Sequence, residues 1–159
     1  MGVSLFPGRY TITDNNEDIV VFVIGMRINK WWAMHKWLPV LMAMPPMIRE
    51  LYMNKELGCL SMENFSRLRT TLLIQYWQSE KHLMAYARGQ KHLKAWADFN
   101  KKVGNNDAVG IYHETYIVPK GNYESIYGNM PKFGLGKVMG TTPITATTKS
   151  AEHRLKKTP

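Results

Sequence analysis

The clearest signal in the sequence is a series of buried-strand patterns separated by helical ones. Residues 19–26 form an unbroken run of apolar, mostly β-branched side chains, which is typical of a strand buried on both faces. Residues 69–77 and 108–118 also favour strands, and the second of these alternates in polarity until it ends at Pro119. A shorter strand is predicted over residues 58–61.

Two helical regions lie between these strands. The first covers residues 32–54, and because it contains Pro39, Pro45 and Pro46 we expect it to kink or to break into two pieces. Its apolar part, residues 37–48, is too short and too rich in proline to span a bilayer.

The second helical region begins after Ser79, which is a good helix N-cap residue. The pattern pauses at Gly89 and resumes over residues 90–103. Residues 104–107 then have the composition of a turn, so the helix should end there.

The predicted elements follow the order β-α-β-β-α-β. This is the ferredoxin-like α+β arrangement, an antiparallel four-stranded sheet with its helices on one face. The length of 159 residues fits a single domain, which we place over residues 1–140. Residues 141–159 are basic, rich in threonine and without apolar periodicity, so we expect a mobile tail or one that wraps over a neighbouring subunit.

The first predicted strand needs cover on both of its faces. Because the topology places both helices on one side of the sheet, something else must cover the other side. The simplest cover is the same sheet from a second copy, which predicts a homodimer, a dimeric α+β barrel. The alternative is that residues 135–139 and the N-terminal arm cover this face.

Composition narrows the range of functions. The net charge of +9 is scattered along the chain without a dense basic run, so a solvated basic surface is favoured over nucleic-acid binding. The single cysteine, Cys59, excludes a disulfide framework and CxxC redox chemistry and indicates a reducing compartment. Residues 1–6 have no signal-peptide pattern, so we expect a cytoplasmic protein with no membrane partner.

His92 is the first candidate for chemistry. At helical spacing it shares an apolar stripe with Trp96, Phe99 and Val103. An imidazole in such surroundings must find a partner or be desolvated at a cost. Two interpretations follow, a satisfied core histidine or an axial ligand to a metal or heme, for which a neutral imidazole is suited.

His113 is the second candidate. On the last predicted strand it shares a face with Ile111 and Thr115, whereas Tyr112, Glu114 and Tyr116 share the other face. From the pocket side His113 could act as an acid, a base or a hydrogen-bond donor to a ligand. The alternative is a structural bond to a backbone carbonyl or a nearby carboxylate at the barrel rim.

These residues also carry a resemblance to a known family. Residues 75–83 (QYWQSEKHL) and 91–96 (KHLKAW) resemble a stretch of the antibiotic-biosynthesis-type monooxygenases in the dimeric α+β barrel superfamily. The wider span 19–136, including residues 112–116 (YHETY) and 126–131 (IYGNMP), is similar to an uncharacterised family labelled monooxygenase-like after a fungal polyketide monooxygenase.

Two heme-using branches of that superfamily bear on the histidines. Heme-degrading monooxygenases place their proximal histidine on the second helix, where His92 falls. In aldoxime dehydratases the heme-ligating helix precedes a strand that resembles residues 112–114, with its histidine on the distal side. The resemblance thus implies that His92 binds heme iron, that Trp96 contributes to the cofactor site and that His113 is the distal catalytic group. This chain is, however, much shorter than an aldoxime dehydratase, which contains two such modules.

Three functions are therefore expected from the sequence. The first is a monooxygenase-like oxidoreductase that acts on a hydrophobic small molecule in an apolar pocket, with heme held by His92. If no cofactor is bound, His113, Tyr112 or Tyr116 would take a proton from the substrate, and Arg27 and Asn29 are candidates for further pocket residues. The alternatives are a heme-dependent lyase similar to aldoxime dehydratase and a non-catalytic heme or small-molecule binding protein.

Overall fold

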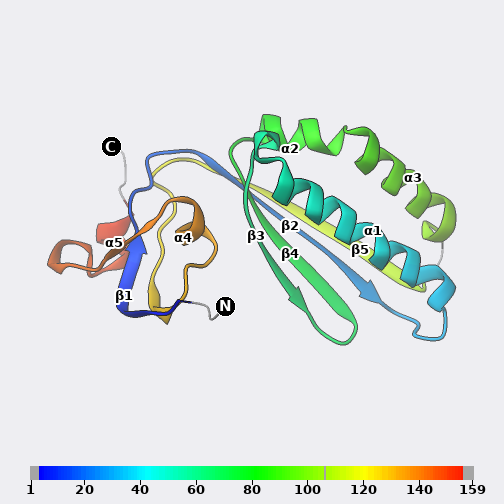
Figure 1. The fold of residues 1–159 in the computed structure, drawn as a ribbon, viewed down its shortest axis with the longest axis horizontal. Helices are drawn as coiled ribbons and strands as arrows, with labels where there is room; N and C mark the ends of the chain where they lie inside the picture. Colours follow the sequence, from blue (N-terminus) through cyan, green and yellow to red (C-terminus); the bar gives the residue numbers. More distant parts are fainter. Residues whose placement is uncertain (1–3, 106, 156–159) are drawn as a thin grey trace.

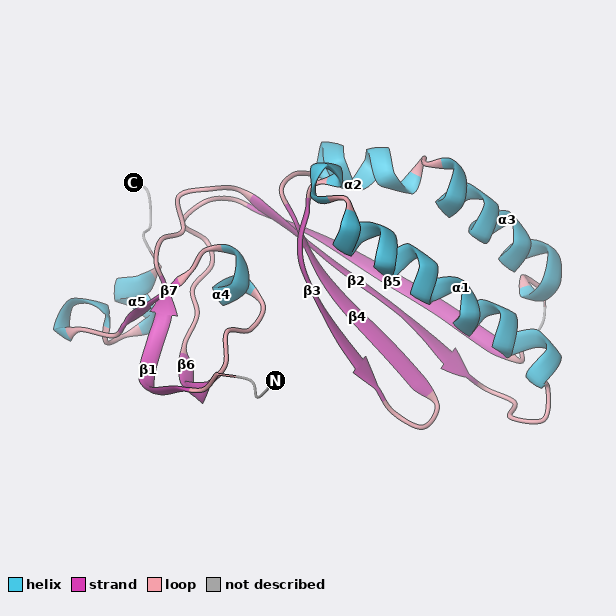
Figure 2. Cartoon of the chain, viewed as in Figure 1, coloured by secondary structure: helices cyan, strands magenta, loops and turns pink. Residues whose placement is uncertain are grey.

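A four-stranded antiparallel sheet with helices on one face makes up the larger part of the molecule (Figures 1 and 2). The computed structural model describes residues 4–105 and 107–155. Its elements are, in chain order, β1 (Phe6–Ile12), β2 (Ile19–Ile28), α1 (Met34–Met53), η1 (Lys55–Leu57), β3 (Cys59–Ser66), β4 (Thr70–Trp77), α2 (Glu80–Ala87), α3 (Gln90–Val103), β5 (Val109–Val118), β6 (Tyr127–Met130), α4 (Leu135–Val138), β7 (Thr141–Pro143), η2 (Ala146–Thr148) and α5 (Ala151–Arg154).

The strand order confirms the predicted fold class. The large sheet has the order β3-β4-β2-β5, and every neighbouring pair is antiparallel. With the helices on one side, this is the ferredoxin-like arrangement that the element order predicted. The strand with the most apolar sequence, β2, lies between β4 and β5, where both of its edges are paired.

The third predicted strand is longer than expected. It was predicted over residues 58–61, but β3 continues to Ser66 and pairs with β4 along this extension. The polar residues Glu63 and Asn64 interrupt the apolar pattern, so the sequence did not predict this part of the strand. Glu63 is accommodated because its carboxylate accepts the Gly134 N–H at 2.8 Å and pairs with Lys137 at 2.6 Å.

The first helix was predicted to kink or to break at its prolines, and the break does not occur. α1 is one continuous helix of 20 residues that contains Pro39, Pro45 and Pro46. Each proline leaves the carbonyl four residues earlier without its helical donor, at a cost of about 3 kcal/mol. All three prolines are exposed, so solvent reaches that side of the helix. The opposite side packs Trp37 and Leu51 into the core, and this packing holds the helix together.

The second helical region matches the prediction. The Ser79 side chain accepts the backbone N–H of His82 and so caps α2. Gly89 separates α2 from α3, which runs over the predicted residues. Within the described part of the chain, no helix is long and apolar enough to cross a membrane.

A small second sheet, which the sequence pattern did not predict, joins the two ends of the chain. It has the order β6-β1-β7. The segment after residue 140, which was predicted to be a tail, therefore begins with a strand that is paired with β1. The Arg154 side chain is 7% exposed and binds Glu124 at 2.7 Å, while its carbonyl accepts from Asn15. Residues 141–155 are therefore packed against the rest of the chain, in part by the backbone pairing of β7 with β1. Residues 156–159, the end of the predicted tail, lie outside the described residues.

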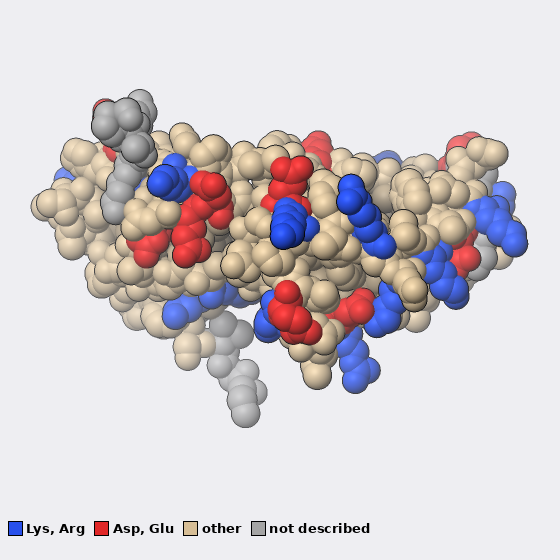
Figure 3. Space-filling model, turned by 90° about the horizontal axis from the view of Figure 1, so that it is seen from above, with Lys and Arg blue, Asp and Glu red and all other residues tan. Residues whose placement is uncertain are grey.

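The charged side chains are dispersed over the surface. In Figure 3, basic and acidic residues are interspersed on the face seen from above, with a group of basic side chains at the end where α1 begins. Nucleic-acid binding therefore stays an unfavoured expectation.

Candidate functional site

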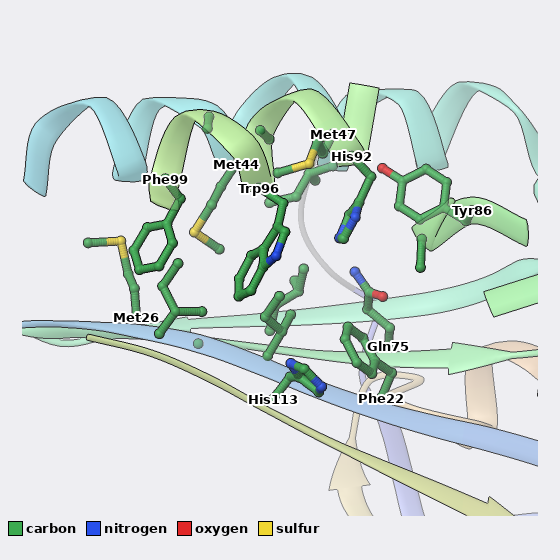
Figure 4. A pocket seen from close by; sticks show the side chains of 18 of the residues that line it. Phe22, Met26, Met44, Met47, Gln75, Tyr86, His92, Trp96, Phe99 and His113 are labelled. Carbon is green, nitrogen blue, oxygen red and sulfur yellow. The ribbon is translucent and has the colours of Figure 1, made fainter. Parts of the chain in front are cut away.

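A cavity of about 400 Å³ lies between the helix-covered face of the sheet and helices α1, α2 and α3. Because side chains alternate along β2, β4 and β5, every second residue of these strands faces the cavity. Its lining is mainly apolar and includes Phe22, Met26, Met44, Met47, Trp96 and Phe99 (Figure 4). A cavity of this size and polarity suits one hydrophobic small molecule or cofactor.

His92 projects into this cavity from α3 (Figure 4). Its side chain is half-buried, and its ring lies edge-on to Tyr86, with ring centroids 5.9 Å apart. Among the described residues the imidazole has no hydrogen-bond partner. The structure therefore disfavours the interpretation of His92 as a satisfied core histidine and places it in the pocket wall.

His113 faces the same cavity from the opposite side. It lies on β5 directly opposite Ile24 of β2, and its ring packs against Phe22 with centroids 5.6 Å apart. The side chain is exposed because β5 is the edge strand of the sheet. The two predicted histidines thus occupy opposite walls of one cavity.

The exposed side of the cavity runs between α3 and β5. Trp96 lines the cavity but is 46% exposed, and it stacks on Phe99 at 5.5 Å. Thr115 and His113 are exposed across from it on β5. This aromatic pair and the edge of β5 form the mouth of the cavity. Val103 was predicted on the same apolar stripe as His92, and its side chain lies outside the described residues.

Three polar residues near the cavity were missed by the sequence reasoning. Gln75 lines the cavity from β4, is 6% exposed, and accepts the indole N–H of Trp77 at 2.9 Å. Tyr86 lines it from α2, and Glu50 lies on α1 close to Tyr86. Gln75 could have been found as a polar residue on the apolar face of a predicted strand. No comparable signal identified Tyr86 or Glu50.

The other candidates lie away from this cavity. As predicted, Tyr112, Glu114 and Tyr116 are on the opposite face of β5, so neither tyrosine reaches a ligand in the cavity. The Tyr116 hydroxyl donates to Glu114 at 2.5 Å, and this bond raises the pKa of Tyr116. Arg27 and Asn29, at the end of β2, do not line the cavity either. Of the three groups expected to abstract a proton, His113 lines the cavity and Tyr112 and Tyr116 do not.

The residues present fit a heme. The cavity offers an imidazole without a competing hydrogen bond, apolar and aromatic walls for a flat macrocycle, and a second imidazole on the opposite wall. In the described residues no group of three or more His, Cys, Asp or Glu side chains is arranged to hold a metal ion. Of the cavity-lining residues, His92 is therefore the one that would hold the iron of such a group.

The fold and the cavity together define a ferredoxin-like α+β protein with a pocket for a small molecule. The family is more specific: residues 19–135 match the model of the family described as monooxygenase af470-like, so the chain belongs to that family. No curated protein sequence matches the chain.

Solved structures share the fold at low sequence identity. An aldoxime dehydratase in complex with butyraldoxime has a TM-score of 0.67 and 16% identity, covering 87% of this chain and 41% of that chain. A second aldoxime dehydratase has a TM-score of 0.64 and 17% identity, covering 82% and 42%. SnoaB, a cofactor-independent oxygenase from Streptomyces nogalater, has a TM-score of 0.42 and 11% identity, covering 62% and 91%. This chain thus spans about two fifths of the dehydratase chains.

Proposed function

We propose that this protein is a monooxygenase-like oxidoreductase that acts on a hydrophobic small molecule in the apolar cavity, with a heme held by His92. The observation that carries the proposal is the placement of His92 and His113 on opposite walls of one apolar cavity. Membership in the monooxygenase af470-like family supports an oxygenase reaction.

Each residue has a defined task in this proposal. His92 would hold the heme iron, and Trp96 and Phe99 would form the aromatic wall of the heme site near the mouth. When bound, the heme supplies an iron centre for oxygen or oxime chemistry. His113 donates a hydrogen bond or a proton to the reacting ligand, and its exposure at the strand edge allows it to be reprotonated from solvent.

The apolar lining selects the substrate and excludes water. The flexible side chains of Met26, Met44 and Met47 adapt to ligands of different shape. Because the cavity of about 400 Å³ accommodates one ligand of drug or cofactor size, a heme-bound protein retains room only for a small substrate or one that extends into the mouth.

A lyase reaction on an aldoxime is the second candidate. The same pair of histidines suits it, since dehydration of an aldoxime to a nitrile and water needs a proton donor but no external electrons. The two reactions differ in their requirements: only the monooxygenase consumes oxygen and a reductant. Butyraldoxime, the ligand of the structurally similar dehydratase, is the appropriate probe.

The active form is proposed to be a homodimer. The sheet face opposite the helices carries the half-buried residues Val23, Leu72 and Ile74, and beside them Tyr112 and Phe65 are 41% and 43% exposed. The segment around α4 covers only one end of this face, at β3. A second copy packed on the remainder would remove this apolar surface from water.

A hemin titration followed by absorption spectroscopy tests the proposal. We expect the wild-type protein to bind hemin with a sharpened Soret band and His92→Ala to lose affinity by about 100-fold or more, since metal affinity depends on the ligand and on its partners. His35→Ala, an exposed histidine on α1, is the matched control and should bind as the wild type does. An unchanged spectrum in His92→Ala would refute the ligand assignment.

A further variant separates an enzyme from a simple binding protein. His113→Ala should keep its hemin and lose turnover of the substrate, because His113 touches the ligand rather than the iron. If His113→Ala retains full turnover, its catalytic role is refuted. If the wild type binds no hemin at all, the heme part of the proposal fails, and the cofactor-free oxygenase and the small-molecule binding protein are the candidates left.

A further inference from the structure

Two buried polar atoms beside the cavity, one on α1 and one on α2, have no hydrogen-bond partner in the described part of the chain. They are the hydroxyl of Tyr86 on α2 and Oε2 of Glu50 on α1. Folded proteins satisfy nearly all such atoms, so two of them close together require an explanation. Neither residue has a task in the function proposed above.

Glu50 is held in place from the other side. Its Oε1 accepts from the Lys91 ammonium at 2.7 Å, which ties α1 to α3 at the residue next to His92. The Glu50 side chain is only 19% exposed, and its bond to Lys91 holds the carboxylate in one position. Oε2 is therefore a fixed acceptor within the protein.

Tyr86 lies close to both this acceptor and His92. Its hydroxyl is buried and has no partner in the described part of the chain, so its O–H is available to donate. Its ring centroid is 5.9 Å from that of His92, and in Figure 4 its hydroxyl points toward His92. A phenol hydroxyl can donate one hydrogen bond and accept another at the same time.

We propose that Glu50 and Tyr86 are positioning residues for His92. Neither bond is formed in the structure, so the proposal requires these side chains to rotate: the Tyr86 O–H would then donate to Glu50 Oε2, and the Tyr86 oxygen would accept the N–H of one imidazole nitrogen of His92. The arrangement satisfies both unpartnered atoms and keeps the other imidazole nitrogen deprotonated and directed at the cavity. Hydrogen-bond partners of this kind orient a histidine that binds a metal and raise its basicity. This effect of Glu50 and Tyr86 on iron binding rests on the proposed function.

The tautomer of His92 in the ligand-free protein is the direct test. Nitrogen chemical shifts of the labelled imidazole should show one dominant tautomer in the wild type and a mixture in Tyr86→Phe and in Glu50→Gln. The controls Tyr52→Phe and Glu56→Gln change exposed residues at the end of α1 and should leave the tautomer unchanged. An unchanged tautomer in both test variants would overturn the proposal.

Hemin affinity gives an independent readout. Each test variant should bind hemin about 10- to 100-fold more weakly than the wild type, as is typical when the partner of a metal ligand is removed. Because the three groups act as one chain, the double variant should be no weaker than the weaker single variant. Fully additive losses would refute the chain. If the wild type binds no hemin, the proposed function fails, and the tautomer measurement still decides the positioning proposal.

Stability distinguishes a bonded hydroxyl from an unpartnered one. If Tyr86 makes these bonds, Tyr86→Phe should unfold at a lower urea concentration than the wild type. If the hydroxyl is unpartnered in solution, removing it relieves a buried polar atom and the urea midpoint should be unchanged or higher. The second result would contradict the proposal.

Discussion

Both faces of the four-stranded sheet carry apolar side chains, but they have different neighbours. On one face α1, α2 and α3 cover the strands and enclose the cavity with His92 and His113. On the other face only one end is covered, where Phe133 packs on Phe65 with ring centroids 6.1 Å apart. The comparison teaches that one sheet separates a face that lines a cavity from a face that the described residues leave largely uncovered.

The covered face is itself divided into a solid part and a hollow part. Near the start of α2, Trp77 and Leu51 belong to a packed cluster with almost no exposure. At the other end, α3 and the edge strand β5 enclose the mouth of the cavity, which is lined by Trp96 and His113. We expect stability to depend on the first part and ligand binding on the second.

The largest expected effect comes from the solid part. Trp77 is completely buried, so Trp77→Ala should lower the free energy of unfolding by about 3–5 kcal/mol, through lost packing and the cavity left behind. Urea unfolding followed by circular dichroism measures this loss. The control Trp32→Ala, at a position that is 79% exposed, should change stability far less. Equal losses in the two variants would contradict the division of the core.

The second prediction concerns the uncovered face. Ile74 lies on it between Val23 and Glu63, so Ile74→Lys should place a charge in the dimer interface and cost about 3 kcal/mol or more, roughly 100-fold in the dimer dissociation constant. Light scattering should show a wild-type dimer at micromolar concentration and a monomeric variant. The same substitution at Ile117, which is 59% exposed on the helix side, should leave the dimer intact. A monomeric wild type would refute this interface.

The third prediction tests the polar floor of the cavity. Gln75→Leu removes the acceptor of the Trp77 indole N–H and should lower the free energy of unfolding by about 1–3 kcal/mol. Denaturant titration measures the change, with Gln78→Leu at an exposed position as the control. A variant as stable as the wild type would mean that the Gln75 bond does not contribute to holding this face together.

The smallest expected effect is a pH dependence from the solid core. Burial raises the pKa of the Cys59 thiol to about 11, well above that of an exposed thiol. Above pH 9 the unfolded chain loses this proton while the folded chain keeps it, so stability should fall as pH rises from 9 toward 11. Urea midpoints at pH 8 and pH 10 measure the fall, and Cys59→Ala should reduce it. An equal fall in Cys59→Ala would assign the effect to other groups, such as Tyr86.

Local patterns in the sequence predicted most of the large sheet and its helices. They failed where a residue's partner is distant: Glu63 allows β3 to continue because Gly134 and Lys137 neutralise it, and the prolines of α1 are tolerated because Trp37 and Leu51 pack on the sheet. The sequence pattern did not predict the small sheet for the same reason. Its strands β1 and β7 lie near opposite ends of the chain and pair through backbone hydrogen bonds, which a polarity pattern does not record.

By itself, the sequence determined which way the candidate side chains face. Strand alternation separates His113 from Tyr112, and helical spacing aligns His92 with Trp96. Only the tertiary structure decided that the two histidines share one cavity, and that Glu50, bonded to Lys91 across 41 residues, lies near Tyr86 in the cavity wall. The physical reason is that polarity patterns act over one or two turns of chain, whereas a cavity is formed by side chains that only the packing of distant elements brings together.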